Sequence, residues 1–156
     1  MTGKQARSLL SCVGLCLFVG FLGSLFVPGE WYENLNKSSL TPPNIVFPIV
    51  WNMLFVLMGL AAWRVWASED IGLKKIAITI FLFQLILNVC WSYLCFGIQR
   101  PDLALLDIIV LWVFILITLV LFYRADRIAG FLFLPYCLWV SFAIHLNYSI
   151  YQLNNF

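Results

Sequence analysis

The chain has 156 residues, of which 63% are hydrophobic and 10% are charged, and its formal net charge is +2 at pH 7. These values, with a mean hydropathy of +0.98, lie outside the range of soluble globular domains. The few basic residues are scattered, so the sequence gives no indication of a nucleic-acid-binding surface. We therefore expect an all-α integral membrane protein in contact with the lipid bilayer.

Five apolar runs, each bounded by charged residues or proline, predict a single domain of five transmembrane helices. The expected boundaries are residues 8–27, 44–66, 76–98, 103–123 and 128–150. Each run has about the twenty residues that a helix needs to cross a hydrocarbon core about 30 Å thick. One connection is long, residues 28–43, and this loop is the most plausible place for function outside the helices.

Basic residues separate between the two sides of the predicted bundle. Those expected on the side of the N-terminus are Lys4, Arg7, Arg64, Lys74, Lys75, Arg124 and Arg127, and those expected on the other side are Lys37 and Arg100. Lysine and arginine are enriched in cytoplasmic loops. The N-terminus is therefore predicted to be cytoplasmic, and the C-terminus and loop 28–43 are predicted to face outward.

The first apolar run is open to two interpretations. Lys4 and Arg7 before it resemble the start of a secretory signal, but the run continues to Val27 and predicts a retained helix. Small residues recur at every fourth position of this helix, namely Cys12, Cys16, Gly20 and Ser24. Such a stripe lets a neighbouring helix approach closely. Packing within the molecule is favoured here over a dimer face.

Aromatic and polar side chains gather at one depth of the predicted bundle. Trp51, Trp91 and Trp139 lie roughly 10 Å or more below the outer boundary at 1.5 Å per helical residue, too deep for an interfacial belt. The polar residues of the same half are Asn88, Asp107, His145 and Asn147. A charged group at the centre of the hydrocarbon costs about 2.5 to 3.5 kcal/mol, so such groups are expected to face the bundle interior.

Prolines point to the same region. Thr41 followed by Pro42 fits an N-cap with proline at the first helical position. Pro48 and Pro135 are expected to lie inside helices and to bend them shortly before Trp51 or Trp139, because proline lacks the amide donor of the helix. Room between bent helices is a common ligand site.

The residues that could hold a metal or haem are few. The five cysteines, Cys12, Cys16, Cys90, Cys95 and Cys137, lie in predicted helices without a CxxC pair, so a metal centre is not predicted. His145 could be an axial ligand of a haem, but a lone histidine in a helix is more often hydrogen-bonded to a neighbour. Asp107 is expected to have a structural role rather than to act in a proton relay. No cofactor is expected to be required.

Several motifs follow one another along the whole chain. In and after the long loop these are Trp31, Tyr32, Leu35, Lys37, Thr41, Pro42, Pro43, Phe47, Pro48, Trp51, Met58 and Gly59. In the last three spans they are Leu87, Asn88, Trp91, Ser92, Phe96, Gly97, Ala104, Asp107, Pro135, Tyr136, Trp139, Phe142, Ala143, Leu146 and Asn147. This pattern resembles the translocator protein family, also called tryptophan-rich sensory proteins or peripheral-type benzodiazepine receptors (TspO/MBR).

The resemblance implies a five-helix bundle, often a homodimer, with a pocket that loop 28–43 covers as a lid. Family ligands include porphyrins and other tetrapyrroles, sterols and benzodiazepine-site drugs. The residues that match the family's pocket are Tyr32, Pro42, Trp51, Phe55, Asn88, Trp91, Trp139, Ala143 and Leu146. The ligand implied for this chain is protoporphyrin IX, a haem-related tetrapyrrole or another flat hydrophobic molecule.

The resemblance leaves three functions open. The favoured one is a receptor or transport-type protein that binds porphyrins and has a sensory or regulatory role in tetrapyrrole or stress responses. The second is light- and oxygen-dependent degradation of protoporphyrin IX, in which the resemblance implies a role for Trp51 and Trp139. The sequence shows no hydrolytic triad, metal centre or nucleotide loop, so such chemistry would depend on the photoreactivity of the porphyrin itself.

The third function is sterol binding or transport, and one departure from the family weakens it. The sterol motif of the animal members needs a basic residue after the leucine and tyrosine, which are Leu146 and Tyr148 here. Gln152 stands in its place and no lysine or arginine follows. This difference favours a protein of a bacterial cell membrane.

Overall fold

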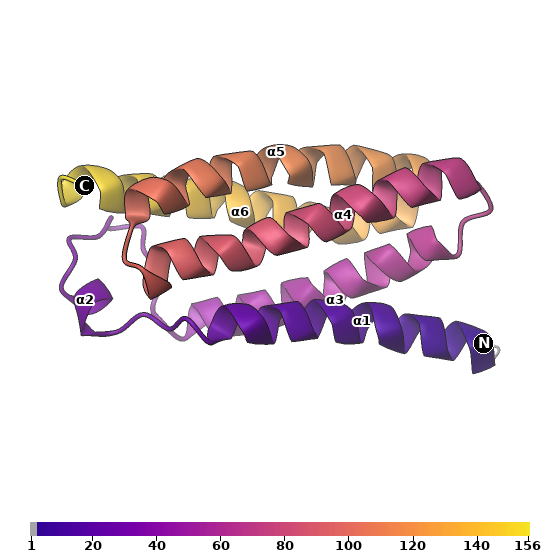
Figure 1. The fold of residues 1–156 in the computed structure, drawn as a ribbon, viewed down its shortest axis with the longest axis horizontal. Helices are drawn as coiled ribbons and strands as arrows, with labels where there is room; N and C mark the ends of the chain where they lie inside the picture. The colour runs from indigo at the N-terminus through magenta and orange to yellow at the C-terminus, as the bar shows by residue number, and fades with distance from the viewer. Residues whose placement is uncertain (1–2) are drawn as a thin grey trace.

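A computed structural model describes residues 3–156 as a bundle of long helices (Figure 1). The long helices are α1 (Gly3–Ser24), α3 (Val46–Trp66), α4 (Ile71–Ser92), α5 (Pro101–Ala125) and α6 (Arg127–Leu153). A short helix, α2 (Glu30–Glu33), lies in the long loop, and a π-helix, η1 (Tyr93–Gly97), extends α4. The structure has 5 helices long and apolar enough to cross a membrane, and no β-strand occurs within residues 3–156. The predicted all-α fold with five transmembrane helices is confirmed.

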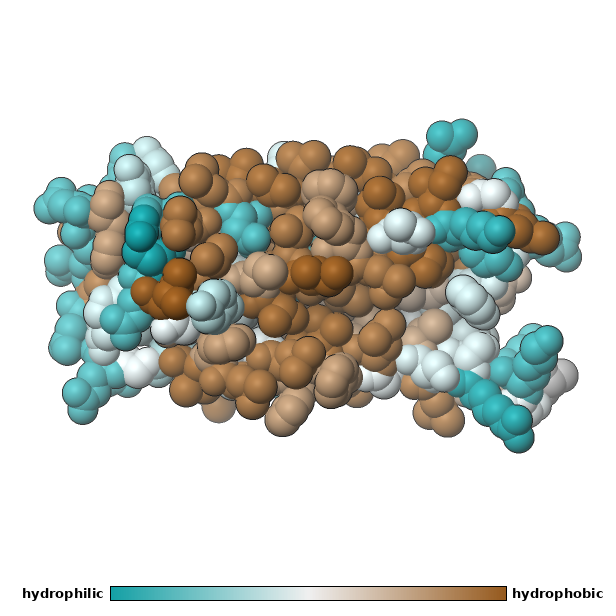
Figure 2. Space-filling view, viewed as in Figure 1, coloured by the Kyte–Doolittle hydropathy of each residue, from teal (hydrophilic) through white to brown (hydrophobic). Residues whose placement is uncertain are grey.

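The long helices run alternately in opposite directions, so the bundle has two distinct ends (Figure 1). One, which we call the loop end, carries the 25–45 loop with α2, the turn after η1 and the end of α6. The other, which we call the turn end, carries the start of α1 and the short α3–α4 and α5–α6 turns. Hydrophilic residues gather at both ends and hydrophobic ones cover the band between them (Figure 2). An apolar band of this kind suits contact with lipid.

The start of α4 differs from the predicted boundary at Ile76. The helix begins at Ile71 because Asp70 caps it, its Oδ1 accepting a hydrogen bond from the N–H of Leu73 at 2.9 Å. Lys74, whose charge marked the predicted boundary, folds back instead. Its Nζ donates hydrogen bonds to the carbonyl oxygens of Trp66 and Ser68 at 3.1 and 2.8 Å, so it covers the end of α3.

The N-cap predicted at Thr41 does not form, although the second span begins close to the predicted residue 44. Thr41 and Pro42 are non-helical, and α3 begins at Val46. Pro42 precedes another proline, and a residue in that position avoids the α conformation for steric reasons. Pro48 therefore lies in the first turn of α3, where the backbone N–H has no intrahelical partner in any case, so it removes no hydrogen bond from the helix.

Pro135, by contrast, lies inside α6 as predicted, and the helix continues through it to Leu153. Its ring removes one backbone donor from the interior of α6, a helix of 27 residues. The bend expected at this position stays a prediction.

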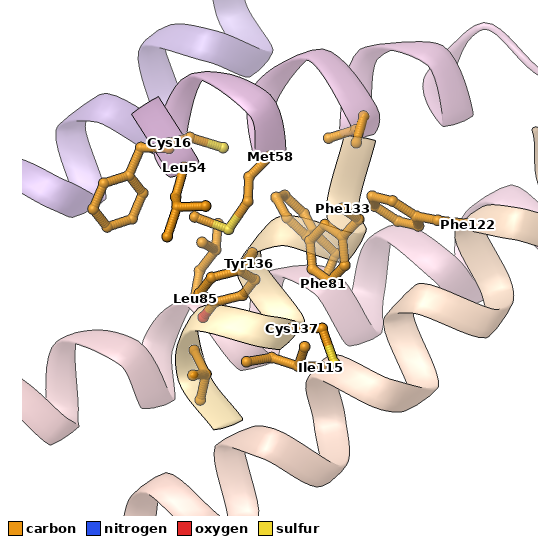
Figure 3. Close-up of a cluster of buried hydrophobic side chains, with 14 of the residues drawn as sticks. Cys16, Leu54, Met58, Phe81, Leu85, Ile115, Phe122, Phe133, Tyr136 and Cys137 are labelled. Atoms are coloured by element: carbon orange, nitrogen blue, oxygen red, sulfur yellow. The ribbon is translucent and has the colours of Figure 1, made fainter. Parts of the chain in front are cut away.

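The core lies where α3, α4, α5 and α6 meet, toward the middle and the turn end (Figure 3). Met58, Phe81, Phe133 and Tyr136 are buried there. The rings of Phe81, Phe122 and Phe133 lie with their centroids 5.2 to 6.1 Å apart, a range in which aromatic pairs attract. This cluster packs α4, α5 and α6 together between the middle of the bundle and the turn end.

The small residues of α1 pack inside the molecule. Cys16 is 0% exposed, and a Cβ placed on Gly20 would lie 2.6 Å from the ring of Phe55 on α3. On α3, Gly59 also allows a close approach of the two helices, since a Cβ on Gly59 would lie 2.6 Å from the backbone Cα of Val13 on α1. The stripe thus serves the contact between α1 and α3, the interpretation that the sequence favoured.

Candidate functional site

A cavity of about 600 Å³ opens at the loop end between α1, α3, the α4–η1 segment and α6. Its aromatic lining residues are Phe21, Phe26, Tyr32, Phe47, Trp51, Phe55, Trp91 and Phe96. The amide side chains of Asn44, Asn52, Asn88 and Asn147 also line it. Ligand sites for small molecules usually have about 300 to 1,000 Å³, mostly apolar walls and a few polar groups. The cavity has both properties.

Most of the predicted pocket residues lie together in this wall. They are Tyr32, Trp51, Phe55, Asn88, Trp91, Ala143 and Leu146. Trp51 stacks on Phe55 with 5.6 Å between ring centroids and meets the ring of Tyr136 at 6.1 Å. Residues from the lid, α3, α4 and α6 are thus brought to one space, although they lie far apart in the sequence.

Two of the predicted residues, Pro42 and Trp139, are not part of the cavity wall. Pro42 belongs to the non-helical stretch before α3. Trp139 lies one ring behind the wall, with its centroid 6.0 Å from that of Phe47, which does line the cavity. Its Nε1 is buried and has no hydrogen-bond partner within residues 3–156.

Two parts of the wall were not predicted from the sequence. The end of α1 contributes Leu17, Gly20, Phe21, Gly23 and Ser24, the segment that follows it contributes Phe26 and Val27, and η1 contributes Cys95 and Phe96. The small residues of α1 could have indicated the first part, because Gly20 leaves the space in which Phe55 sits. No sequence signal predicts the π-helix, a form that is rare and is often found at functional sites.

A buried network of three polar side chains lies behind one wall. The Tyr136 hydroxyl donates a hydrogen bond to Gln84 Oε1 at 2.9 Å and accepts one from Asn88 Nδ2 at 3.1 Å. Gln84 Nε2 is buried and has no partner within the described part of the chain. Because the amide nitrogen of Asn88 is held by Tyr136, the orientation of the amide in the wall is fixed from behind.

A second network holds the indole of Trp91. Trp91 Nε1 donates to Asn147 Oδ1 at 2.9 Å, and Asn147 Nδ2 donates to the carbonyl oxygen of Pro101 at 2.9 Å. The Trp91 ring also meets Phe96 edge to face, with 5.6 Å between centroids. These contacts join α4, α5 and α6 at the depth of the cavity, so Trp91 presents a fixed face to it.

Loop 28–43, for which we keep the name lid, reaches the cavity wall through Tyr32 of α2. Tyr32 is 8% exposed and its ring meets Phe96 edge to face at 5.4 Å. On its other side, Lys37 Nζ lies 4.5 Å from the ring centroid, a distance at which cation–π attraction acts. Burial, and then the charge of nearby Cys95, raise the pKa of the Tyr32 hydroxyl. Tyr32 is therefore neutral at physiological pH and belongs to the apolar closure of the site.

The other residues considered for ligation lie elsewhere. His145 is exposed on α6 and is not among the residues of the wall. Asp107 on α5 is also outside the wall, and its Oδ2 is buried without a hydrogen-bond partner in residues 3–156. Within the same residues, no group of three histidine, cysteine, aspartate or glutamate side chains could hold a metal ion.

At the turn end, an ion pair joins α3 to the start of α6. Arg64 binds Asp126 with both nitrogens of one edge of its guanidinium, Nε to Oδ1 at 3.0 Å and Nη2 to Oδ2 at 2.7 Å. Asp126 also caps α6, since its Oδ1 accepts the N–H of Ala129 at 2.9 Å. The hydrogen bonds from Arg64 lower the pKa of Asp126. This pair fixes the end of the bundle that lies away from the cavity.

Comparison with known proteins places the whole bundle in one family. The sequence model of the TspO/MBR family matches residues 12–153. The chain is 44% identical to the tryptophan-rich protein TspO of Chlorobaculum tepidum, over 97% of this chain and 98% of that protein. It is 39% identical to the tryptophan-rich sensory protein of Cereibacter sphaeroides, over 93% and 90%. It is 34% identical to the human translocator protein, over 86% and 83%.

The family match covers α1 from residue 12 onward, the other four long helices, the lid and every residue of the cavity wall. The apolar band between the two polar ends agrees with the presence of five helices long and apolar enough to cross a membrane (Figure 2). The chain is therefore an integral membrane protein of the TspO/MBR family.

Proposed function

We propose that this protein is a membrane receptor that binds a porphyrin, such as protoporphyrin IX, or a related flat tetrapyrrole in the cavity at the loop end. The observation that carries the proposal is the composition of the wall, where aromatic rings from α1, α3, α4 and η1 surround about 600 Å³. Stacked or edge-on aromatic pairs contribute about 0.5 to 1.5 kcal/mol each beyond the burial of apolar area. A flat conjugated macrocycle is the class of ligand that gains most from such walls.

The positions of the polar groups favour one orientation of the ligand in the cavity. The Asn88 amide offers hydrogen bonds inside the cavity, whereas Lys37 lies at the lid, its Nζ donating to the Glu33 carbonyl oxygen at 3.1 Å. A porphyrin carries its carboxylates on one edge of the ring. That edge would face Lys37 and water, while the apolar edge would lie among the tryptophans. The benzodiazepine-site drugs of the family are smaller apolar molecules that suit the same walls.

The experiment is a fluorescence titration of the purified protein in lipid nanodiscs with protoporphyrin IX. Saturable quenching of tryptophan emission is expected, and Trp51→Phe should weaken the binding because it removes the larger ring of the stacked pair with Phe55. Trp66→Phe is the matched control, since Trp66 is 54% exposed on α3 near the turn end. Quenching that does not saturate, or equal affinities for both variants and the wild type, would contradict the proposal.

For the setting of this function we infer a cytoplasmic N-terminus and an outward-facing lid. The support is the separation of charge along the bundle axis. Seven of the basic residues considered above lie at or near the turn end, and two, Lys37 and Arg100, lie at the loop end. Because such a bias keeps the basic end in the cytoplasm, a porphyrin would reach the cavity from the outer side and be sensed or carried from there.

A second candidate function is degradation of the bound porphyrin under light and oxygen, with the porphyrin as reductant and dioxygen as oxidant. One observation favours it: Trp51 lies in the wall and Trp139 contacts the wall through Phe47, so both indoles lie within one ring of the ligand space. Illumination of the aerobic complex should then form a new pigment, more slowly in Trp51→Phe and in Trp139→Phe. Equal rates of porphyrin loss in the wild type and both variants would exclude a role for the protein in this chemistry.

A further inference from the structure

The segment after α6 is bonded to the lid by one side chain. The backbone N–H of Asn36 donates to Asn154 Oδ1 at 2.9 Å, and Asn154 Nδ2 donates back to the Asn36 carbonyl oxygen at 3.0 Å. The same Nδ2 donates to the carbonyl oxygen of Ile150 at 2.9 Å. The amide of Asn154 thus satisfies both backbone groups of one lid residue and ties them to the last turn of α6.

A ring contact joins the same two segments. Phe156 meets Trp31 of α2 edge to face, with 6.1 Å between centroids and an interplanar angle of 66°. The chain reaches this position because Asn155 adopts a left-handed backbone conformation with φ of 54°, which asparagine tolerates better than most residues. The Asn154–Phe156 segment therefore contacts the lid at two residues, through hydrogen bonds to Asn36 and a ring contact with Trp31.

These contacts lie at the rim of the cavity. Trp31 adjoins Tyr32, whose ring closes the wall, and Ile150 belongs to the wall on the side of α6. The loop that carries α2 passes beside the end of α6 at the loop end of the bundle (Figure 1). The contacts thus connect the covering loop with a helix that carries part of the wall.

The hydrogen bonds between the lid and the end of the chain lie at the surface, where they can break and re-form. The hydrogen bonds between Asn36 and Asn154 are exposed to water, so water competes for each of them and their net contribution is small. The covering residue Tyr32 makes a ring contact with Phe96 and a cation–π contact with Lys37. A few weak contacts can hold a lid closed most of the time and still release it often enough for exchange of a ligand.

We propose that Asn154–Phe156 act as a clasp for the lid, and that Asn154 is a positioning residue that sets how often the cavity opens to water. The role of this clasp in ligand exchange rests on the proposed function, but opening of the lid can be measured with no ligand present. Cys95 provides the probe, because it lines the cavity, is 3% exposed and directly precedes Phe96, whose ring contacts that of Tyr32. A water-soluble thiol reagent reaches Cys95 when the lid opens.

The test is the rate at which a small methanethiosulfonate labels Cys95 of the full chain in lipid nanodiscs, read by peptide mass spectrometry. Asn154→Ala is expected to raise this rate about tenfold, which corresponds to about 1.4 kcal/mol, about the net contribution of one hydrogen bond to a stable closed state. Phe156→Ala should raise it by a smaller factor. Gln152→Ala is the matched control, since the Gln152 side chain bonds only to Tyr148 one turn back on the same helix in the described structure.

Labelling of Cys16 in the same samples separates lid opening from unfolding. Cys16 is 0% exposed between α1 and α3 and is not part of the cavity wall, so its rate should stay unchanged in Asn154→Ala. Equal Cys95 rates in Asn154→Ala and Gln152→Ala would overturn the clasp, and so would a parallel rise at Cys95 and Cys16. If protoporphyrin fails to bind the wild type, the porphyrin proposal falls while the labelling result still decides on the clasp.

Discussion

The hydroxyl of Tyr136 offers a one-atom test of the buried network behind the cavity. Tyr136 is 0% exposed, and its hydroxyl is bonded to Gln84 Oε1 and to Asn88 Nδ2. Tyr136→Phe removes two hydrogen bonds and leaves the Gln84 oxygen and the Asn88 amide nitrogen without this partner, in side chains that are 0% and 5% exposed. Buried unpaired groups cost about 1 to 3 kcal/mol, while single polar contacts between membrane helices average about 0.6 kcal/mol. We expect a loss of about 1 to 3 kcal/mol.

The assay is equilibrium unfolding of the purified protein in mixed detergent micelles, with porphyrin affinity measured on the folded variant. Affinity should also fall, because Asn88 loses the bond that orients its amide in the wall. Tyr148→Phe is the matched control: Tyr148 is 45% exposed on the same helix, and its hydroxyl accepts a hydrogen bond only from Gln152 among the described contacts. If Tyr136→Phe is as stable as Tyr148→Phe, the network does not support the bundle in the way argued here.

Three further predictions concern packing, charge and orientation. Gly59→Leu should destabilise the bundle by about 1 to 3 kcal/mol through overpacking against Val13, whereas Gly14→Ala, with nothing within 4 Å of its new Cβ, should be neutral in the same unfolding assay. The lowered pKa of Asp126 means that its stabilising effect is present above the carboxyl's unfolded value, about 3.9, and is lost as pH falls through the lower folded value. Wild-type stability should therefore drop below about pH 4, and Arg64→Gln should reduce that drop; an identical pH profile would argue against the ion pair. A tag fused after Phe156 should be labelled from outside intact cells, and labelling only after the cells are opened would reverse the inferred orientation.

The helices could be predicted because the membrane imposes a length and an apolar composition that a sequence displays directly. Their ends were harder to place. Hydropathy falls at Lys74, yet the helix begins at Ile71, because Asp70 caps it and the Lys74 ammonium bonds to carbonyl groups of the preceding turn. At Thr41 the predicted N-cap does not form, and the helix begins later than the cap would place it. The reason is that Pro42 is followed by another proline, and a residue before proline avoids the helical conformation.

Depth in the bundle predicted Trp51, Asn88, Trp91 and Trp139, whereas the other pocket residues were implied by the family resemblance. Depth alone has a limit. Trp51, Trp91 and Trp139 share a level in the bundle, but only the first two line the cavity. A tryptophan's depth follows from counting residues, whereas the direction it faces depends on how its helix packs. Trp139 faces Phe47 rather than the open space.

The clasp and the π-helix could not be predicted for a related reason. Asn154 bonds to Asn36 across 118 positions of the chain, and no local pattern encodes such a pair. The widened turn of η1 is likewise set by its neighbours, with Gly97 admitting the rings of Phe26 and Tyr93 close to its Cα.

The central claim is that the cavity at the loop end is the binding site, and filling it tests that claim most directly. Ala143 lines the cavity on α6, so Ala143→Trp should occupy the ligand space and lower the affinity for protoporphyrin IX by about tenfold or more, about 1.4 kcal/mol or more. Leu138→Trp adds a ring to the same helix at a position that is 63% exposed and should leave the affinity unchanged. Equal, wild-type affinity in both variants would place the binding site outside the cavity.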